Sequence, residues 1–328
     1  MSNLVIGIDI GGTKIAAGAV DQHGKVVQTS QVPTLAQESR EKVLEQVFLS
    51  VEKLDLDMDL VQGIGVCAPG PLQDGVLINP PNIKNWQSLP LSKIITERYG
   101  LPTIAENDAN AAAYAEMVFG SAKGYQNFVY VTVSTGIGTG IIIGGKIYRG
   151  KNGLAGEGGH ITINYEHKSS SSGGVPGSIE SLASGTAIAK NAQGIMLSNP
   201  KVETLLWNYI NYEGNISETN LEELTTHHIR EAISKGDNFA KSLLEDAGTQ
   251  IGIWLGGVVS LLDPEVIVIG GGAMEISENL IEQIRKTMPK FTINQFAGNT
   301  PIISTALKQN VGIYGAASLI YERLKKRH

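Results

Sequence analysis

Cysteine is nearly absent from this sequence: among 328 residues, only Cys67 carries a thiol. A single thiol cannot form an internal disulfide, and it cannot build a zinc site made of cysteines. The residues around it, Ile64, Val66 and Ala68, are apolar or small. We therefore expect Cys67 to be a buried, unreactive thiol.

Long apolar runs are also missing. No stretch reaches the about 18 apolar residues that indicate a membrane-spanning helix. The first ten residues have the character of a strand, not of a signal peptide. We therefore expect no membrane partner and a cytoplasmic protein.

Basic residues are too few for a surface that binds nucleic acid. Lys and Arg total 26 against 32 Asp and Glu, which gives a net charge of −6. A nucleic-acid-binding protein normally shows a basic stripe, and the short run 325–327 is better explained as a solvated helix end. We expect no nucleic-acid partner.

Glycine is the residue in excess, with 39 in the chain. That is about 12%, against an average of about 7%. No Gly-X-Y period accompanies it, which excludes a collagen-like chain. The glycines gather at the ends of expected strands, where backbone can approach a ligand closely.

The periodicity predicts an α/β protein, and the length predicts two domains. In the first half, strands are expected over 4–10, 14–20, 25–32, 62–67 and 102–105, and helices over 39–54, 91–99 and 107–119. The first three strands read as an antiparallel meander.

The pattern then restarts with a strand, a Gly-rich turn, a strand, a tight turn and a returning strand. These features lie at 127–133, 134–140, 141–143, 144–145 and 146–148; later strands are expected at 161–164, 265–269 and 302–306, and helices at 238–262, 277–288 and 312–325. The repetition is one of architecture, and it indicates a duplicated fold.

Two Gly-rich turns follow strands, at Asp9–Thr13 and Thr135–Gly140. Backbone N–H groups that carry no bulky side chains can converge there on phosphate oxygens. Asp9 itself could stabilise the turn, or could contact Mg²⁺ through water beside a phosphate. The glycines of Gly270–Gly272 could approach an adenosine, or could form an ordinary loop.

Polar side chains stand among small or apolar residues at three further places. They are the segment Glu106–Asn110, the segment Gly156–His160, and Glu180. Each alone would most simply be a helix cap or a surface charge. Together they offer carboxylates, an amide and an imidazole, a set that suits a ligand with several hydroxyls.

These motifs resemble the ROK family of bacterial sugar kinases and sugar-responsive repressors. The resemblance rests on DIGGTK at 9–14, ENDANAAAYAE at 106–116, STGIGTGIIIGG at 134–145 and GEGGH at 156–160, in the family's order along the chain. It implies a duplicated actin/hexokinase-like (ribonuclease H-like) α/β fold, with two domains and an interdomain cleft. We expect a small N-terminal domain over 1–120, on which the terminal helix 312–328 packs back, and a larger domain over 121–311.

The resemblance also assigns roles to residues. Asp108 would be the general base, and Asn82, Asn107, Glu157, His160 and Glu180 would hold the sugar hydroxyls. Gly11, Gly12, Thr13, Thr135, Gly136 and Gly138 would surround the phosphates of ATP, and Gly271 and Gly272 would lie near the adenosine. Lys14 could reach a phosphate or only solvent.

The sequence departs from the family at one place. Members carry three cysteines that bind structural zinc together with the histidine of the GEGGH-type motif, whereas the matching positions here are Ser171, Gly173 and Ser178. We therefore expect no zinc, and we expect serine hydrogen bonds or packing of Val175 and Pro176 to order this segment. His160 would then either donate to a sugar hydroxyl or make a structural hydrogen bond.

The family's repressors carry a DNA-binding domain ahead of the first Gly-rich hairpin. Here the motif of that hairpin begins at the ninth residue, Asp9, which leaves no room for such a domain. We therefore expect a kinase. The favoured activity is transfer of phosphate from ATP to the 6-hydroxyl of a hexose, with glucose as acceptor. N-acetylmannosamine, N-acetylglucosamine and a polyphosphate donor stay open, as does a sugar sensor without catalysis. An actin-like filament protein would not need ENDAN or GEGGH. The resemblance further implies a homodimer or a higher homo-oligomer.

Overall fold

The computed structural model describes residues 4–78, 80, 83, 85–171, 173–210, 221–272, 278–307 and 310–325. The chain forms two compact units. The first comprises Met1–Tyr130, Gly140–Gly156 and Ser304–His328, and the second comprises Val131–Thr139 and Glu157–Ile303. The terminal segment thus belongs to the first unit, and so does the segment 140–156, which the expected domain limits assign to the second.

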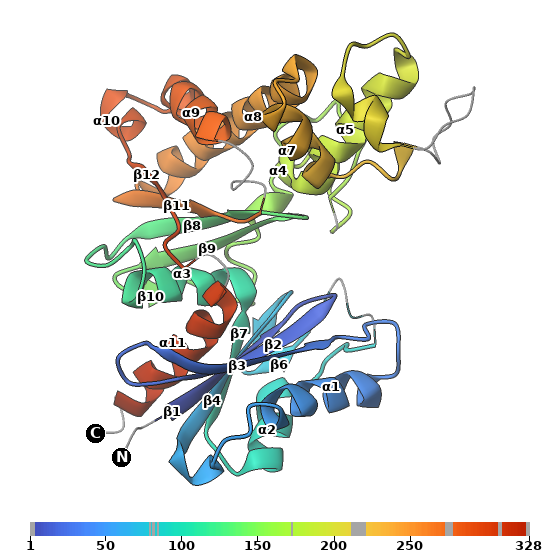
Figure 1. Ribbon diagram of the computed structural model, residues 1–328. Coiled ribbons are helices and arrows are strands. Elements are labelled where there is room, and N and C mark those ends of the chain that lie inside the picture. The colour runs from blue at the N-terminus through green and yellow to red at the C-terminus, as the bar shows by residue number, and fades with distance from the viewer. Residues whose placement is uncertain are drawn as a thin grey trace. The chain divides into compact units, whose positions relative to one another are not determined.

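The first unit is built on a five-stranded sheet with the order β3-β2-β1-β4-β7 (Figure 1). Its strands are β1 (Leu4–Ile10), β2 (Lys14–Val20), β3 (Val26–Pro33), β4 (Val61–Ala68) and β7 (Thr103–Asn107). The first three are antiparallel, and β4 and β7 run parallel to β1. A small hairpin, β5 (Leu72–Gln73) and β6 (Val76–Leu77), follows β4.

Side chains alternate between the two faces of this sheet, as the period of a strand requires. Ile6, Ile8 and Ile10 face a core that includes buried residues of α1 (Arg40–Glu52) and α2 (Leu91–Tyr99). The opposite face packs against α11 (Val311–Lys325), which in turn packs against α3 (Asp108–Val118).

Glycines on β1 and β4 let α11 lie directly on the sheet. A Cβ at Gly7 would stand 2.2 Å from the carbonyl oxygen of Ile313, and a Cβ at Gly65 would stand 1.8 Å from that of Ala316. Both positions face α11, and Asp9 shares their face because it follows Gly7 by two residues. This close approach brings the start of α11 to the carboxyl end of β1.

A second five-stranded sheet has the order β10-β9-β8-β11-β12. Its strands are β8 (Phe128–Val133), β9 (Ile137–Ile143), β10 (Lys146–Ile147), β11 (Val266–Gly270) and β12 (Ile302–Ser304). Across each sheet, the three strands of a meander come in the order third, second, first, and two strands from later in the chain lie beside the first. The expected duplication of the architecture is therefore confirmed.

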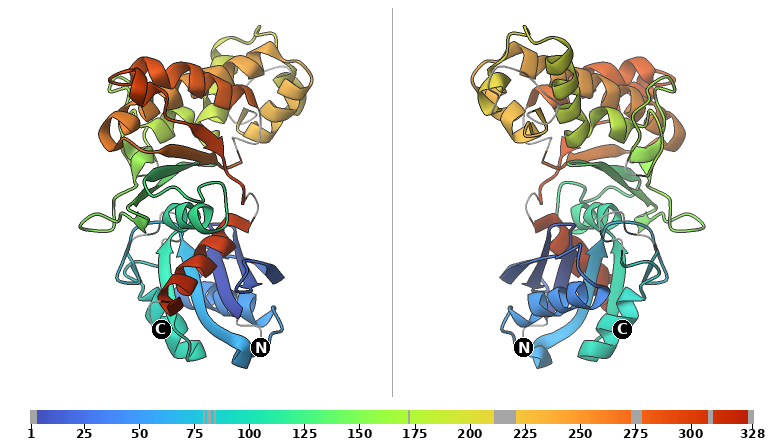
Figure 2. Two further views of the ribbon diagram at one scale, coloured as in Figure 1. Left: turned by 90° about the vertical axis from the view of Figure 1, so that its left-hand side faces the viewer. Right: turned by 90° about the vertical axis from the view of Figure 1, so that its right-hand side faces the viewer.

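Helices make up most of the second unit. They are α4 (Ile179–Ala183), α5 (Gly185–Ser198), α7 (Thr226–Ser234), α8 (Asn238–Leu262), α9 (Glu278–Thr287) and α10 (Gln295–Gly298), with short 3-10 turns at Met58–Leu60 in the first unit and at Gly158–His160, Leu205–Tyr209 and Met288–Phe291 in the second. The long helix α8 packs against α9, α4, α5 and α7, and Figure 2 shows α8 and α9 side by side. None of the helices in the described part of the chain is long and apolar enough to cross a membrane.

Most expected strands and helices are present within a few residues of their expected limits. The expected strand over 161–164 is wrong. This segment has only an isolated bridge, between Thr162 and Ser178, and Ile161 is exposed. Among the described residues, no neighbouring strand completes a ladder with this alternating pattern. Strand β9 also begins earlier than expected, at Ile137, inside the Gly-rich turn.

Candidate functional site

Polar residues line up across the carboxyl ends of the three parallel strands of the first unit. Asp9 on β1 is opposite Cys67 on β4, and Cys67 is opposite Glu106 on β7. Asn107 ends β7, and Asp108 begins α3. Ligands of open α/β sheets bind outside this end of the strands. The fold thus gathers residues from two separate motifs at one edge.

The turn from β7 into α3 is fixed by its own side chains. Asn107 caps the helix, because its Oδ1 accepts from the backbone N–H groups of Ala109 at 2.9 Å and Asn110 at 3.1 Å. Its Nδ2 donates to the carbonyl oxygen of Gly70 at 3.3 Å. Asp108 accepts from the N–H of Ala109 at 2.8 Å through Oδ1. The carboxylate of Asp108 is therefore oriented at the first turn of α3.

Glu106 lies buried behind this turn and is paired with a cation. Its Oε1 accepts from the N–H of Asn107 at 3.0 Å and from Nδ2 of Asn110 at 3.1 Å. Its Oε2 accepts from Nε of Arg149 at 2.7 Å. From the sequence alone, Glu106 has no role of its own and nothing marks Arg149, which stands after a hairpin between Lys146 and Lys151.

Asp9 lies half-buried against the start of α11. Burial raises the pKa of its carboxyl, whereas the Cys67 thiol, which donates to Oδ1 at 3.4 Å, and the charge of Lys14 lower it. A Cβ at Gly312 would lie 2.2 Å from Oδ2 of Asp9. The glycine therefore leaves the space that the carboxylate fills.

Cys67 is buried, as expected, and its thiol is poorly suited to act as a nucleophile. Burial raises the pKa of its thiol far above the ordinary value, and the charges of Asp9 and Asp108 add to that rise. A thiol held neutral is a poor nucleophile. Cys67 acts as a hydrogen-bond donor to Asp9 and lies within the field of Asp108.

The first Gly-rich turn has a folded backbone with exposed side chains. The N–H of Gly11 donates to the carbonyl oxygen of Lys14 at 2.9 Å, and Thr34 donates through Oγ1 to the carbonyl oxygen of Gly11 at 2.7 Å. Gly11 and Gly12 are half-buried, and Thr13 and Lys14 are exposed. The turn is thus preformed, and its outer rim is open to a ligand.

The second Gly-rich turn is held by Glu180. The Oε2 of this residue accepts from the N–H of Ile137 at 3.0 Å, and a Cβ at Gly136 would stand 2.5 Å from the same oxygen. Glycine at 136 therefore leaves room for the Glu180 carboxylate in this position. Gly138 follows on β9 and is half-buried.

Glu157 and His160 flank a 3-10 turn of the same unit. Nε2 of His160 lies 3.5 Å from Oε2 of Glu157, and Nδ1 lies 2.8 Å from Oγ of Ser171. Burial raises the pKa of Glu157, His160 lowers it, and the charge of Glu180 raises it further. Two of the expected sugar ligands, His160 and Glu180, are therefore close enough to the third, Glu157, for their charges to shift its pKa. The other expected ligand from a loop, Asn82, lies outside the described residues.

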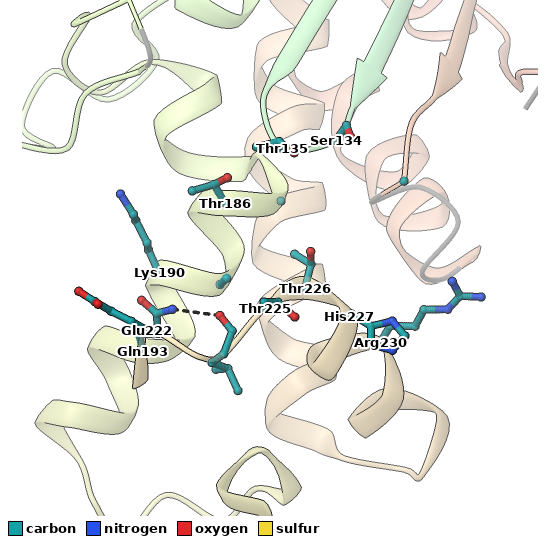
Figure 3. Close-up of a pocket in the computed structure, with 14 residues that line it drawn as sticks. Ser134, Thr135, Thr186, Lys190, Gln193, Glu222, Thr225, Thr226, His227 and Arg230 are labelled. Atoms are coloured by element: carbon teal, nitrogen blue, oxygen red, sulfur yellow. Dashed lines mark hydrogen bonds between the residues drawn. The ribbon is translucent and has the colours of Figure 1, made fainter. Parts of the chain in front are cut away.

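A pocket of about 660 Å³ opens in the second unit (Figure 3). The end of β8, the first turns of α5 and α7, and the end of β11 surround it. Its lining residues are Ser134, Thr135, Gly185, Thr186, Ala189, Lys190, Gln193, Glu222, Leu224, Thr225, Thr226, His227, Arg230 and Gly272. Gln193 donates to the carbonyl oxygen of Leu224 at 3.0 Å, which ties α5 to the segment before α7.

Two of the expected nucleotide contacts, Thr135 and Gly272, thus share one pocket. Gly271 does not line the pocket. It lets the end of β11 lie close to the end of β8, since a Cβ at 271 would stand 2.3 Å from the carbonyl oxygen of Val133. The cations Lys190 and Arg230 were missed at the sequence level. They lie on α5 and α7, in stretches without a recognisable motif, and only the fold brings them to the glycines.

The described part of the chain contains no cluster of three His, Cys, Asp or Glu side chains suited to a metal ion. Ser171 and Ser178 offer hydroxyls where thiolates would be required, and Gly173 offers no ligand. The expected absence of zinc stays a prediction. The proximity of Asp9 to Mg²⁺ stays one as well.

A family model described as "ROK family" matches residues 5–323. The glucokinase of Streptomyces coelicolor is 34% identical over 325 residues, covering 97% of this chain and 98% of that protein. The xylose repressor of Bacillus subtilis is 28% identical over 321 residues, covering 97% of this chain and 77% of that protein. The crystal structure of a ROK family glucokinase from Streptomyces griseus in complex with glucose and AMPPNP superposes with a TM-score of 0.82 at 32% identity, covering 96% of this chain and 98% of that one. The chain belongs to the ROK family and has that family's actin/hexokinase-like, two-domain α/β fold.

Proposed function

We propose that this protein is a sugar kinase that transfers the γ-phosphoryl group of ATP to the 6-hydroxyl of a hexose, with glucose as the favoured acceptor. The observation that carries the proposal is the turn from β7 into α3, where the first turn of the helix orients Asp108, close enough to Cys67 that the charges of Asp108 and Asp9 both raise the pKa of its thiol. Similarity to the glucokinases of Streptomyces coelicolor and Thermotoga maritima, at 34% and 27% identity, supports the choice of acceptor.

Asp108 is the proposed general base. Its carboxylate takes the proton of the attacking hydroxyl while that oxygen forms a bond to the γ-phosphorus and the bond to the β,γ-bridging oxygen breaks, which releases ADP. The oriented carboxylate pays little reorganisation cost, since its Oδ1 already accepts from Ala109. The side chains of Asn107, Glu157, His160 and Glu180 are the proposed partners of the sugar hydroxyls.

The pocket of the second unit is the proposed place for the nucleotide. Its glycine at Gly272, its threonines and its two cations fit the adenosine and phosphates of ATP. At the other Gly-rich turn, Asp9 fits a role near Mg²⁺: burial disfavours its charge, and a cation beside it would restore that charge. When bound, Mg²⁺ would neutralise the charge on the transferring phosphates.

A coupled assay for ADP release tests the activity. The purified protein is given Mg-ATP with glucose, mannose, fructose, glucosamine, N-acetylglucosamine or N-acetylmannosamine, and separately with polyphosphate in place of ATP. We expect strong turnover with glucose. A strong response only to an N-acetyl sugar would correct the acceptor and leave the kinase standing.

A sugar sensor without catalysis is the second candidate. It is favoured by the match to the Bacillus subtilis xylose repressor, which runs over 97% of this chain. Calorimetry with the same sugars separates the two proposals. Sugar binding without ADP release from any acceptor would establish the sensor and refute the kinase.

A further inference from the structure

Each ring nitrogen of His160 faces a polar side chain, and the one at Nδ1 is within hydrogen-bond distance. Nδ1 lies 2.8 Å from Oγ of Ser171, and Nε2 lies 3.5 Å from Oε2 of Glu157. Ser171 is nearly buried, at 9% exposed, and its Oγ also accepts from the N–H of Val175 at 3.2 Å. The ring therefore lies between a fixed hydroxyl and a carboxylate.

These partners determine which nitrogen of a neutral His160 carries the hydrogen. An ionised Glu157 can only accept, so the nitrogen that faces it, Nε2, carries the hydrogen. Nδ1 is then an acceptor, and the hydroxyl of Ser171 donates to it. The N–H of Val175 occupies one of the two lone pairs of the same oxygen, an arrangement that lets the hydroxyl hydrogen point to Nδ1.

Ser171 and residues 173–178 close around the ring through their backbone. The N–H of Ser171 donates to the carbonyl oxygen of Val175 at 3.0 Å, and that of Gly174 donates to the carbonyl oxygen of Ser171 at 2.9 Å. A Cβ at Gly173 would lie 3.1 to 3.4 Å from three atoms of the imidazole. The main chain at 173 therefore packs on His160.

The same segment also positions the next carboxylate. Ser178 is fully buried, and its Oγ accepts from the N–H of Ser181 at 3.3 Å, which caps α4. Glu180 lies in the first turn of that helix and reaches the N–H of Ile137. Serine hydroxyls thus fix both ends of the segment.

The zinc that the family resemblance implies does not fit these residues. Hydroxyls stand at 171 and 178, and neither is a thiolate. Both hydroxyls are already engaged, Ser171 with His160 and Val175, and Ser178 with Ser181. The segment is closed by hydrogen bonds where relatives would use a metal.

We propose that Ser171 is a positioning residue for sugar binding: its hydroxyl holds His160 as the Nε2–H tautomer against Glu157, in a segment ordered without metal. The inference rests on the proposed function, because it assumes that His160 and Glu157 meet the sugar. It adds that sugar affinity depends on one hydroxyl that need not touch the sugar itself.

Kinetics of Ser171→Ala test the role. We expect the KM for glucose to rise about three- to tenfold, the size of one lost hydrogen bond, while the KM for ATP stays within about twofold. Ser169→Ala is the matched control, since Ser169 is exposed and its backbone carbonyl is what binds Gly177. An unchanged KM for glucose, or an equal rise in both KM values, would refute the positioning role.

The tautomer is measured on the unaltered protein, and a variant serves only to assign the signal. Nitrogen-15 spectra of histidine-labelled protein, with His160 assigned through its loss in His160→Gln, should show the Nε2–H form. The Nδ1–H form would overturn the proposal. If no sugar is phosphorylated, the proposed function fails, while the tautomer and the calorimetric affinity for glucose still test Ser171.

Metal content completes the test. The purified protein should hold no stoichiometric zinc, and incubation with a chelator that is removed before Mg-ATP is added should leave the KM for glucose unchanged. One zinc per chain, or a chelator-sensitive KM, would show that the segment is metal-ordered and that the hydroxyl of Ser171 does not replace a metal.

Discussion

Arg149 binds Glu106 through its Nε at 2.7 Å, although 43 residues separate the two in the chain. Glu106 is almost fully buried, whereas about half of the Arg149 side chain, 48%, stays exposed. The other oxygen of Glu106 holds the N–H of Asn107 and the side chain of Asn110. One arginine therefore balances the charge behind the turn that presents Asp108.

Removal of this arginine should destabilise the protein and slow the reaction. In Arg149→Ala the buried carboxylate of Glu106 loses its cation, and we expect a loss of about 1–3 kcal/mol in unfolding free energy, below the full cost for a buried pair because Arg149 is half exposed. We also expect kcat to fall, since Glu106 holds the start of α3. Urea unfolding and steady-state kinetics measure the two effects.

A double-mutant cycle provides the control. Glu106→Gln removes the buried charge, so Arg149→Ala should cost less in that background than in the unaltered protein. Equal costs in the two backgrounds would mean that the ion pair contributes nothing to the turn.

Asp108 should be needed for turnover and not for sugar binding. We expect Asp108→Asn to lower kcat by about 10²–10⁴-fold, the usual contribution of a general base, with glucose affinity by calorimetry changed little. Asp246→Asn, on the exposed surface of α8, is the matched control and should be inert. Turnover near that of the unaltered protein in Asp108→Asn would remove Asp108 from its proposed role.

Much of the framework could be predicted from the sequence because its signals are local. Buried strands carry β-branched runs, Asn107 precedes an alanine-rich helix that it caps, and the glycine turns stand at strand ends. The duplication was visible as two meanders of the same form. Such features depend on neighbours a few residues away, which the sequence displays directly.

The partners of the motif residues could not be predicted, because the fold alone brings them together. Glu116 ends up fully buried, accepting from the backbone N–H groups of Ala306 and Leu307, about 190 residues further along the chain. The pocket cations Lys190 and Arg230 likewise belong to different helices. A single sequence carries no mark of such pairs.

Replacement of Asp9 should separate stability from function. Burial raises the pKa of this carboxyl in the folded protein, so between the unfolded and folded pKa values the folded state binds more protons and stability falls as pH rises. Asp9→Asn removes that loss. We therefore expect the variant to gain Tm over the unaltered protein as pH rises from 4, and the gain to level off above the folded pKa.

The same variant should be a poorer enzyme. If Asp9 lies near Mg²⁺, Asp9→Asn should raise the KM for Mg-ATP while leaving glucose binding unchanged. Thermal scans from pH 4 to 8, run without nucleotide, measure the first effect, and kinetics at pH 7.5 measure the second. A variant that loses Tm at high pH would contradict the effect of burial on Asp9.

Lys190 provides the sharpest test of the nucleotide pocket, since its side chain lies on α5 among the lining residues in Figure 3. If its ammonium group meets a phosphate of ATP, Lys190→Ala loses a charge-assisted hydrogen bond of about 1.5 kcal/mol, and the KM for ATP should rise about tenfold. The KM for glucose should not change. Added salt should narrow the difference between the two proteins, because salt screens the lost attraction.

Lys201→Ala is the matched control, as Lys201 is exposed and lies outside the pocket lining. An unchanged KM for ATP in Lys190→Ala would mean that the nucleotide does not reach α5. A rise of equal size in Lys201→Ala would mean that the effect comes from the net charge of the protein. The pocket is supported as the nucleotide site only if the KM for ATP rises in Lys190→Ala, while the KM for glucose and the kinetics of Lys201→Ala stay unchanged. A change in net charge would also affect Lys201→Ala, and a general loss of stability would also affect the KM for glucose.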